Sequence, residues 1–213
     1  GIYRSDADVK LKKTDGSLYQ GGDYIIEDLN KDGIINTLDR QIIGSPLPDF
    51  FGGFGTSFSF KSLTLSALFS YSYGNDVYNL LNQKLHSMSD YSNQSTDVTR
   101  RWLSPENPGD GFLPRAAYGD PSNNFATSDR WVEDGSYLKL KSVSINYDIP
   151  LRNRTGFFKG ITVFANGNNL LTVTGYKGMD PEVFSSSHPL LRGVDTGASP
   201  NPRSFIFGVK LAL

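Results

Sequence analysis

The fold of this chain is decided by residues 52–73, which read GGFGTSFSFKSLTLSALFSYSY. Apolar and small polar residues alternate on both sides of Lys61-Ser62, and a period of two is typical of β-strands. The pattern predicts a β-hairpin with strands at 52–60 and 63–73, one face mainly of Ser, Gly and Thr, and an apolar face. That apolar face is expected to carry Phe54, Thr56, Phe58, Phe60, Leu63, Leu65, Ala67, Phe69, Tyr71 and Tyr73.

The same alternation recurs later in the chain. Strands are expected at Tyr137–Ile149, where Pro150 would end the ladder, at 161–166, and at 204–213. The last strand has Phe205, Phe207, Val209, Leu211 and Leu213 on one face. A short helix is expected at Asp76–Lys84. The sequence therefore predicts an all-β, antiparallel protein with about five strands.

The connections between these strands differ greatly in length. Residues 61–62 and 151–160 are short, whereas 75–135 and 173–203 are long and rich in Asn, Ser, Asp, Gly and Pro. In an up-and-down meander the short turns lie at one end of the sheet and the long loops at the other. Outer-membrane barrels have this asymmetry, with short periplasmic turns and long extracellular loops.

A soluble sandwich would also alternate apolar and polar residues, with its apolar face in the core. Small polar residues opposite the apolar face, and an apolar strand at the end of the chain, favour a transmembrane barrel. Because such a barrel needs at least about eight strands and open edges are costly in lipid, residues 1–213 would then end a longer chain. Aromatic residues near the strand ends also favour it, as in interfacial girdles: Phe58, Phe60, Tyr71, Tyr73, Tyr147, Phe205 and Phe207.

Composition excludes several classes of function. The chain has 21 Lys+Arg against 22 Asp+Glu, so it lacks the positive charge of a nucleic-acid-binding protein. It has no Cys, which excludes disulfides, thiolate zinc sites and Cys nucleophiles. His86 and His188 are expected at the surface, and no HExxH, GxSxG or phosphate-loop motif occurs. No enzymatic activity is predicted.

Residues 28–39, DLNKDGIINTLD, have the spacing of an EF-hand loop and resemble a dockerin calcium loop. Gly33 allows a sharp turn, and Asp39 stands where an EF-hand has a bidentate Glu. A structural Ca²⁺ ion is expected to bind the side chains of Asp28, Asn30, Asp32, Asn36 and Asp39 and the carbonyl of Ile34. The alternative is a turn without metal, in which Asp and Asn cap backbone N–H groups.

Several short motifs follow one another from about Gly22 to the C-terminus: Asp28–Ile35, Pro48-Asp49-Phe50, Gly52-Gly53-Phe54, Tyr73–Asn79, Ser128–Lys141, Gly167–Leu170, Gly175–Glu182 and Pro200–Phe205. In this order they resemble the late barrel of SusC/RagA-type TonB-dependent outer-membrane transporters of Bacteroidetes. That family forms a plugged barrel of roughly twenty-two strands. The resemblance implies an extracellular loop at 1–51 and C-terminal barrel strands within 52–213.

The resemblance also implies a function in the cell outer membrane. The whole transporter, including its plug, its N-terminal strands and a TonB contact, would import glycans or peptides with a SusD-like surface lipoprotein. The C-terminus would be periplasmic, and loops 75–135 and 173–203 extracellular. Two alternatives are a passive porin and a soluble calcium-dependent carbohydrate-binding β-domain. Loop aromatics could stack on sugars, although packing between loops is the favoured interpretation for Trp102, Tyr118, Phe125 and Trp131.

Overall fold

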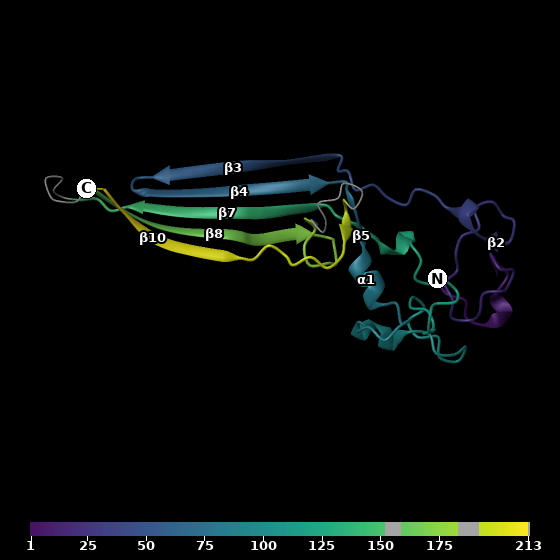
Figure 1. The fold of residues 1–213 in the computed structure, drawn as a ribbon. Helices are drawn as coiled ribbons and strands as arrows, with labels where there is room; N and C mark the ends of the chain where they lie inside the picture. The colour runs from purple at the N-terminus through teal and green to yellow at the C-terminus, as the bar shows by residue number, and fades with distance from the viewer. Residues whose placement is uncertain (152–158, 183–191, 213) are drawn as a thin grey trace. The chain divides into compact units, whose positions relative to one another are not determined.

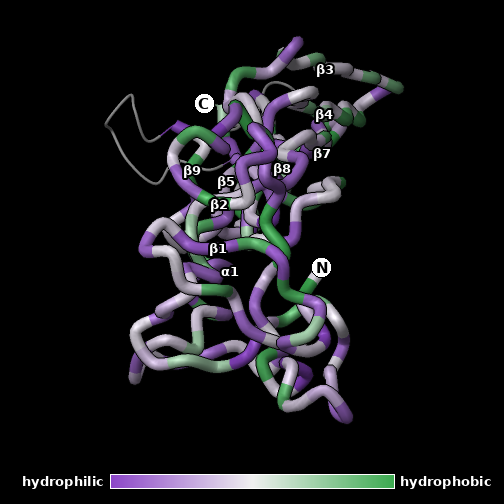
Figure 2. Tube along the Cα trace, turned by 90° about the vertical axis from the view of Figure 1, so that its right-hand side faces the viewer, coloured by the Kyte–Doolittle hydropathy of each residue, from purple (hydrophilic) through white to green (hydrophobic). Residues whose placement is uncertain are grey.

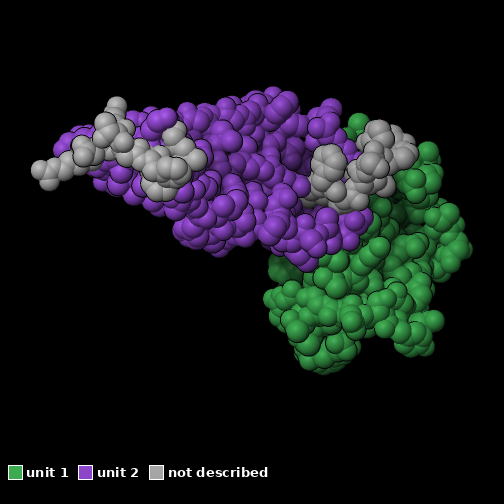
Figure 3. All heavy atoms as spheres, turned by 60° about the vertical axis from the view of Figure 1, so that its left-hand side comes forward, with its two compact units in different colours: residues 1–44, 79–132 green, residues 45–78, 133–213 purple. Residues whose placement is uncertain are grey.

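The structure is a computed structural model that describes residues 1–151, 159–182 and 192–212. Internal contacts define two compact units (Figure 3). Unit 1 comprises Gly1–Gly44 and Asn79–Val132, and unit 2 comprises Ser45–Tyr78 and Glu133–Leu213. The sequence predicts a different division, with an extracellular loop at 1–51 and membrane-spanning strands within 52–213. That division describes position relative to a membrane, which these contacts do not report, so it stays a prediction. Most of the turn predicted at 151–160, His188 and Leu213 lie outside the described residues.

Unit 2 contains an antiparallel five-stranded sheet, with strand order β10-β8-β7-β4-β3 (Figure 1). The predicted strands are confirmed, and two of them are longer than expected because β3 starts at Phe50 and β8 runs to Thr174. Among the described strands, β3 and β10 form the two edges, so the sheet does not close on itself. Its members are β3 (Phe50–Phe60), β4 (Leu63–Tyr73), β7 (Tyr137–Asp148), β8 (Gly160–Thr174) and β10 (Ser204–Ala212).

The hairpin between β3 and β4 has the predicted two-residue turn. Phe60 pairs with Leu63, so only Lys61 and Ser62 connect the strands. Lys61 has a φ of 53°, and tight hairpin turns need a positive φ at this position because it matches the twist of the strands. The register then continues without a shift from Phe60 to Phe50.

A β-bulge interrupts the pairing of β7 with both of its neighbours. On β4, Leu68 pairs with Ser142 but Phe69 pairs with Leu140, so Lys141 has no partner of its own. On β8 the register shifts between the same two β7 residues, Leu140 and Ser142. An extra residue in one strand keeps the apolar face continuous where the alternation changes phase.

A second sheet of three short strands has the order β6-β5-β9, with β5 at Asp76–Asn79, β6 at Val132–Asp134 and β9 at Val194–Asp195. The helix predicted at Asp76–Lys84 begins later, since its first four residues form β5; α1 spans Leu80–Leu85. The Asn79 side chain accepts a hydrogen bond from the Asn82 N–H at 2.9 Å and caps this helix. Among the described residues, none of the helices has the length and apolar character needed to cross a membrane.

Unit 1 is held together mainly by loop contacts. Its short elements are η1 (Asp6–Asp8), β1 (Lys12–Lys13), β2 (Ile34–Ile35), α1, η3 (Thr96–Arg100), η2 (Thr37–Asp39) and η4 (Asp129–Trp131). Strands β1 and β2 pair in parallel, and Trp131 of η4 is buried. Elsewhere in the unit, loops are joined by backbone hydrogen bonds, such as that from the Trp102 N–H to the Leu113 carbonyl at 3.0 Å, and by side chains that accept from the backbone, such as Asp120 from the Asn124 N–H at 2.8 Å.

Asp23 is the centre of unit 1. Its fully buried carboxylate accepts hydrogen bonds from Arg115 Nε at 2.8 Å, Ser122 Oγ at 2.7 Å and Asn124 Nδ2 at 3.0 Å. The Gln20 N–H donates another at 2.8 Å. Burial alone would raise the pKa of Asp23, but these donors more than offset it and the pKa lies below its ordinary value. The carboxylate therefore joins the first loop of the unit to the segment around residue 120.

Candidate functional site: a two-faced sheet and a lysine–carboxylate cluster

One face of the five-stranded sheet is apolar across all its strands. Directly paired residues share a face, and the rows on this side include Thr56–Ala67–Val143–Gly167–Phe205 and Phe58–Leu65–Ile145–Ala165–Phe207. Phe58 is 67% exposed and Phe207 is 76% exposed. Other exposed apolar side chains of this face are Phe54, Phe60, Leu63, Leu65, Leu138, Ile145, Tyr147, Val163, Leu171, Val173, Phe205, Val209 and Leu211.

The opposite face is polar and mostly uncharged, and the change of hydropathy from residue to residue can be followed along β3 and β4 in Figure 2. Its three middle rows are Gly55–Leu68–Ser142–Asn168–Ser204, Ser57–Ser66–Ser144–Asn166–Ile206 and Ser59–Thr64–Asn146–Phe164–Gly208. Hydroxyl groups bond across the strands, at 2.9 Å between the Ser57 and Ser66 oxygens and 3.0 Å between those of Ser59 and Thr64. A few exposed apolar side chains also lie here: Phe51, Leu68 and Ile206.

The length of the strands fits a bilayer. Strands β3 and β4 each contain 11 residues, and at about 3.3 Å per residue such a strand extends about 36 Å. At a tilt of about 45° it rises about 25 Å, the height of the apolar band of an outer-membrane barrel. An apolar face of this extent needs an apolar covering, because soluble monomers rarely expose one.

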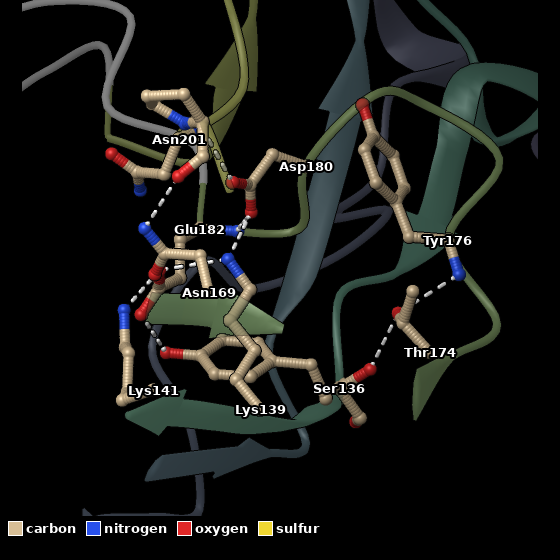
Figure 4. Close-up of polar contacts among 11 residues, drawn as sticks. Ser136, Lys139, Lys141, Asn169, Thr174, Tyr176, Asp180, Glu182 and Asn201 are labelled. Carbon is tan, nitrogen blue, oxygen red and sulfur yellow. Dashed lines mark hydrogen bonds and ion pairs between the residues drawn. The ribbon is translucent and has the colours of Figure 1, made fainter. Parts of the chain in front are cut away.

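A cluster of charged side chains lies at the end of the sheet that is remote from the Lys61-Ser62 turn (Figure 4). Lys139 Nζ of β7 donates to Asp180 Oδ1 and, at 2.8 Å, to Glu182 Oε2. Lys141 Nζ, at the bulge, donates to the same Glu182 oxygen at 2.6 Å. The Tyr137 hydroxyl donates to the other Glu182 oxygen at 3.1 Å. The two carboxylates thus belong to the segment that follows β8.

These contacts keep both carboxylates charged. Burial would raise the pKa of Glu182, but hydrogen bonds from Lys139 and Lys141 hold the pKa below its ordinary range. The pKa of Asp180 is also lowered, because the Lys139 ammonium and the Glu182 N–H offset its burial. The cluster contains two positive and two negative side chains and has no net charge. The motif at 175–182 can be recognised in the sequence, but its contact with Lys139 could not be predicted without the fold.

The predicted calcium loop forms a compact turn. Asp28 accepts hydrogen bonds from the Lys31 and Gly33 N–H groups, each at 2.7 Å, and Gly33 has the positive φ that the spacing predicts. Asp32 accepts from the Ile34 N–H at 2.8 Å, and Asp39 from the Asn36 N–H at 2.8 Å. Among the described residues no three His, Cys, Asp or Glu side chains are grouped as metal ligands. These bonds are of the kind that the alternative without metal predicts, with Asp side chains capping backbone N–H groups. The carboxylate and amide oxygens keep further lone pairs, and Ca²⁺ binding by this loop stays a prediction.

For the long loop at 75–135, the structure corrects the prediction for His86 and agrees with part of the prediction for the aromatic residues. His86 is buried rather than at the surface; its Nδ1 lies 2.8 Å from the Asn82 carbonyl, and its ring is tilted by 32° against that of Trp131, with the ring centroids 6.2 Å apart. Phe125 packs against Tyr24 of the first loop, with ring centroids 6.1 Å apart, which agrees with the predicted packing between loops; Phe125 also lies 6.1 Å from Trp131 in its own loop. Tyr118 is 75% exposed and contacts the ring of Tyr91.

Several known proteins resemble this chain over most of its length. TonB-dependent receptor P26 of Formosa agariphila is 34% identical over 99% of the chain, which covers 21% of the receptor. TonB-dependent receptor P3 of the same organism is 34% identical over 89% of the chain and 19% of the receptor. TonB-dependent receptor SusC of Bacteroides thetaiotaomicron is 26% identical over 86% of the chain and 17% of the receptor. No family model matches the chain.

Solved structures agree with these relatives. The RagAB peptide transporter matches with a TM-score of 0.66 and 26% identity, over 80% of this chain and 18% of the transporter chain. The open-open state of the RagAB peptide importer matches with a TM-score of 0.67 over 100% of this chain and 21% of that chain, at 24% identity. The chain thus spans about a fifth of the length of the proteins that it resembles.

A two-faced antiparallel sheet of this kind defines part of the wall of an outer-membrane β-barrel. Within that class, the chain is similar over nearly its whole length to TonB-dependent receptors, to SusC and to the RagAB transporter, which agrees with the resemblance noted in the sequence. The predicted fold class is confirmed, and the absence of closure reflects the part of the barrel that the chain provides. The relatives are receptors and transporters rather than enzymes, in agreement with the prediction of no catalysis. They do not favour a soluble carbohydrate-binding domain.

Proposed function

We propose that this chain provides lipid-facing wall, lumen lining and outer loops of a TonB-dependent importer that takes up glycans or peptides. The observation that supports this best is the sheet with one continuous apolar face and one mostly uncharged polar face, in a chain whose relatives are TonB-dependent receptors. The remaining strands, the plug and the TonB contact would come from the rest of the transporter. A SusD-like surface lipoprotein is the proposed partner.

The proposed orientation has the C-terminus of β10 in the periplasm. The Lys61-Ser62 turn, the start of β8 and the end of β10 lie at one end of the sheet, since Leu63 is in the row of Tyr147 and Val163 and Gly160 pairs with Ala212. Loops 75–135 and 173–203 leave from the other end, so they are proposed to be extracellular. Short turns on one side and long loops on the other support this orientation.

The calcium loop is proposed to be a structural element of the first outer loop. Side chains of Asp28, Asn30, Asp32, Asn36 and Asp39 and the Ile34 carbonyl would hold Ca²⁺. A bound ion would compensate the negative charge of the three carboxylates, those of Asp28, Asp32 and Asp39. The order of the loop would then depend on the ion, but the ion would take no direct part in transport.

Uptake of labelled cargo tests the proposed function. Cells with and without the complete transporter are given fluorescent oligosaccharides or fluorescent peptides, and internal fluorescence is measured before and after the proton-motive force is collapsed. We expect transporter-dependent uptake of one cargo class that stops when the force is lost. Uptake that persists after collapse would instead indicate a passive porin, and a protein that stays monodisperse without detergent would indicate a soluble domain.

A further inference from the structure

The segment 175–182, between β8 and β9, lies against the polar side of the sheet. Lys139 is paired with Ser70 on β4 and Thr172 on β8, so its side chain belongs to the face of Ser70 and Thr172. That side chain is only 4% exposed although it stands near the end of the sheet. Its ammonium contacts the carboxylates of Asp180 and Glu182 and lies 5.5 Å from the centre of the Tyr137 ring.

Two further side chains of β7 reach the same segment. Tyr137 pairs with Ser72 and Thr174 on the polar face, and its hydroxyl bonds to Glu182. Lys141 is the additional residue of the bulge, and its ammonium also reaches Glu182. Three side chains of one strand therefore converge on a single carboxylate, which fixes the side of the sheet on which the segment lies (Figure 4).

The start of the segment is fixed as well. The buried Tyr176 donates its hydroxyl hydrogen to Asp195 at 2.6 Å, and its N–H bonds to Thr174 Oγ1 at 3.1 Å. Gly178 packs so closely that an added Cβ would lie 2.3 Å from the Tyr176 ring. Burial of Tyr176 raises the pKa of its phenol, which stays a hydrogen-bond donor. Both ends of the segment are thus tied to unit 2.

We propose that residues 175–182 form a fixed inward strap, which lines and narrows the passage at the loop end of the barrel and contacts cargo there. This inference rests on the proposed function, because the polar face is the lumen face only in a membrane barrel. Lys139 and Lys141 pin the strap through Asp180 and Glu182. Met179, which is 59% exposed, directly precedes Asp180 in the sequence and reports the position of the strap.

Spin labelling of the complete transporter in liposomes tests the strap. One nitroxide is placed at Met179, and reference nitroxides are placed at Leu171 and Thr172, neighbouring residues on opposite faces of β8. Collisions with lipid-soluble oxygen and with a water-soluble nickel complex are measured for each label. We expect Met179 to be immobilised and accessible to nickel, as Thr172 should be, whereas Leu171 should be accessible to oxygen.

The pin is tested by the variant Lys139→Met with Lys141→Met, and by Lys141→Met alone in case the double variant folds poorly. The double variant should lose the immobilised component at Met179, and Lys141→Met alone, which leaves Lys139 in place, should reduce it; Lys177→Met, in the same segment but outside the cluster, should keep it. An unchanged immobilised spectrum in the variants, or access of oxygen to Met179, would overturn the strap. A Leu171 label that meets nickel rather than oxygen would instead overturn the proposed contact of the apolar face with lipid, and with it the proposed function, whatever the result at Met179.

Discussion

Replacing Val143 with arginine should destabilise the sheet strongly if its apolar face contacts lipid. Val143 lies near the middle of β7 and pairs with Ala67 and Gly167, whose small side chains leave room for a larger neighbour. The cost should therefore come from placing a charge in hydrocarbon rather than from a clash. Arginine at the midplane of a membrane barrel costs about 2–4 kcal/mol, which is about 30- to 700-fold in the folding equilibrium.

Two variants on the same strand are matched controls. Tyr147→Arg places the same charge on the same face but close to the turn end, where the expected cost is about 0–1 kcal/mol. Ser144→Arg places it on the polar face, one residue away, where no lipid is expected. The three variants thus separate depth in the membrane from the identity of the face.

The assay is reversible urea unfolding of the complete transporter in lipid vesicles, followed by tryptophan fluorescence and by the mobility shift of the folded barrel on gels. We expect Val143→Arg to lower the free energy of unfolding most. Ser144→Arg and Tyr147→Arg should each lower it only slightly. Equal losses for Val143→Arg and Tyr147→Arg would refute the depth argument. A loss for Ser144→Arg as large as that for Val143→Arg would refute the assignment of faces.

Three further predictions concern unit 1 and the calcium loop, and hydrogen exchange of the complete transporter can check each. Asp23→Ala should destabilise unit 1 by about 3 kcal/mol, because Arg115 loses its buried partner. Folding lowers the pKa of Asp23, so the carboxylate contributes its full stability above the ordinary pKa of 3.8. That stability is lost as the pH falls through the lowered pKa of the folded state. Gly22→Ala should cost about 1–3 kcal/mol, because φ is +86° and the new Cβ would lie 2.6 Å from the Trp102 ring. Asp32→Ala should speed exchange in residues 28–39 and reduce uptake, as a calcium chelator should in the parent; if neither treatment changes thermal stability or uptake, the loop has no such role.

Most of the sheet could be predicted from alternation alone, because one face is apolar and a slip of one residue would invert every strand. The bulge also left a trace in the sequence. Leu138 and Leu140 are apolar at even positions, whereas Val143 and Ile145 are apolar at odd positions, and the change of phase falls at Lys141. A strand with such a change needs one extra residue to keep its apolar face continuous.

Other features could not be predicted because their causes are distant in sequence. Residues 76–79 become β5 through backbone bonds such as that from the Tyr78 N–H to the Gly193 carbonyl, at 2.8 Å, so the helix starts only at Leu80. The burial of His86 depends on η4, which lies more than forty residues later. Ion pairs between Lys139 and the segment 175–182 likewise require the pairing of β7 with β8. Local pattern holds no information on such contacts.

The three middle rows of the polar face contain Ser, Thr, Asn, Gly and a few apolar residues, and none of their side chains ionises near neutral pH. A surface of this kind keeps the same electrostatic character when the acidity of the surroundings changes. Dissolved salt has little to screen there, because screening acts on charges. If this face lines the lumen as proposed, these rows would meet cargo alike in dilute and in saline water. The charged side chains of the same face lie nearer the strand ends, at Lys139, Asp148 and Lys210, and a response of this sheet to its medium would come from there.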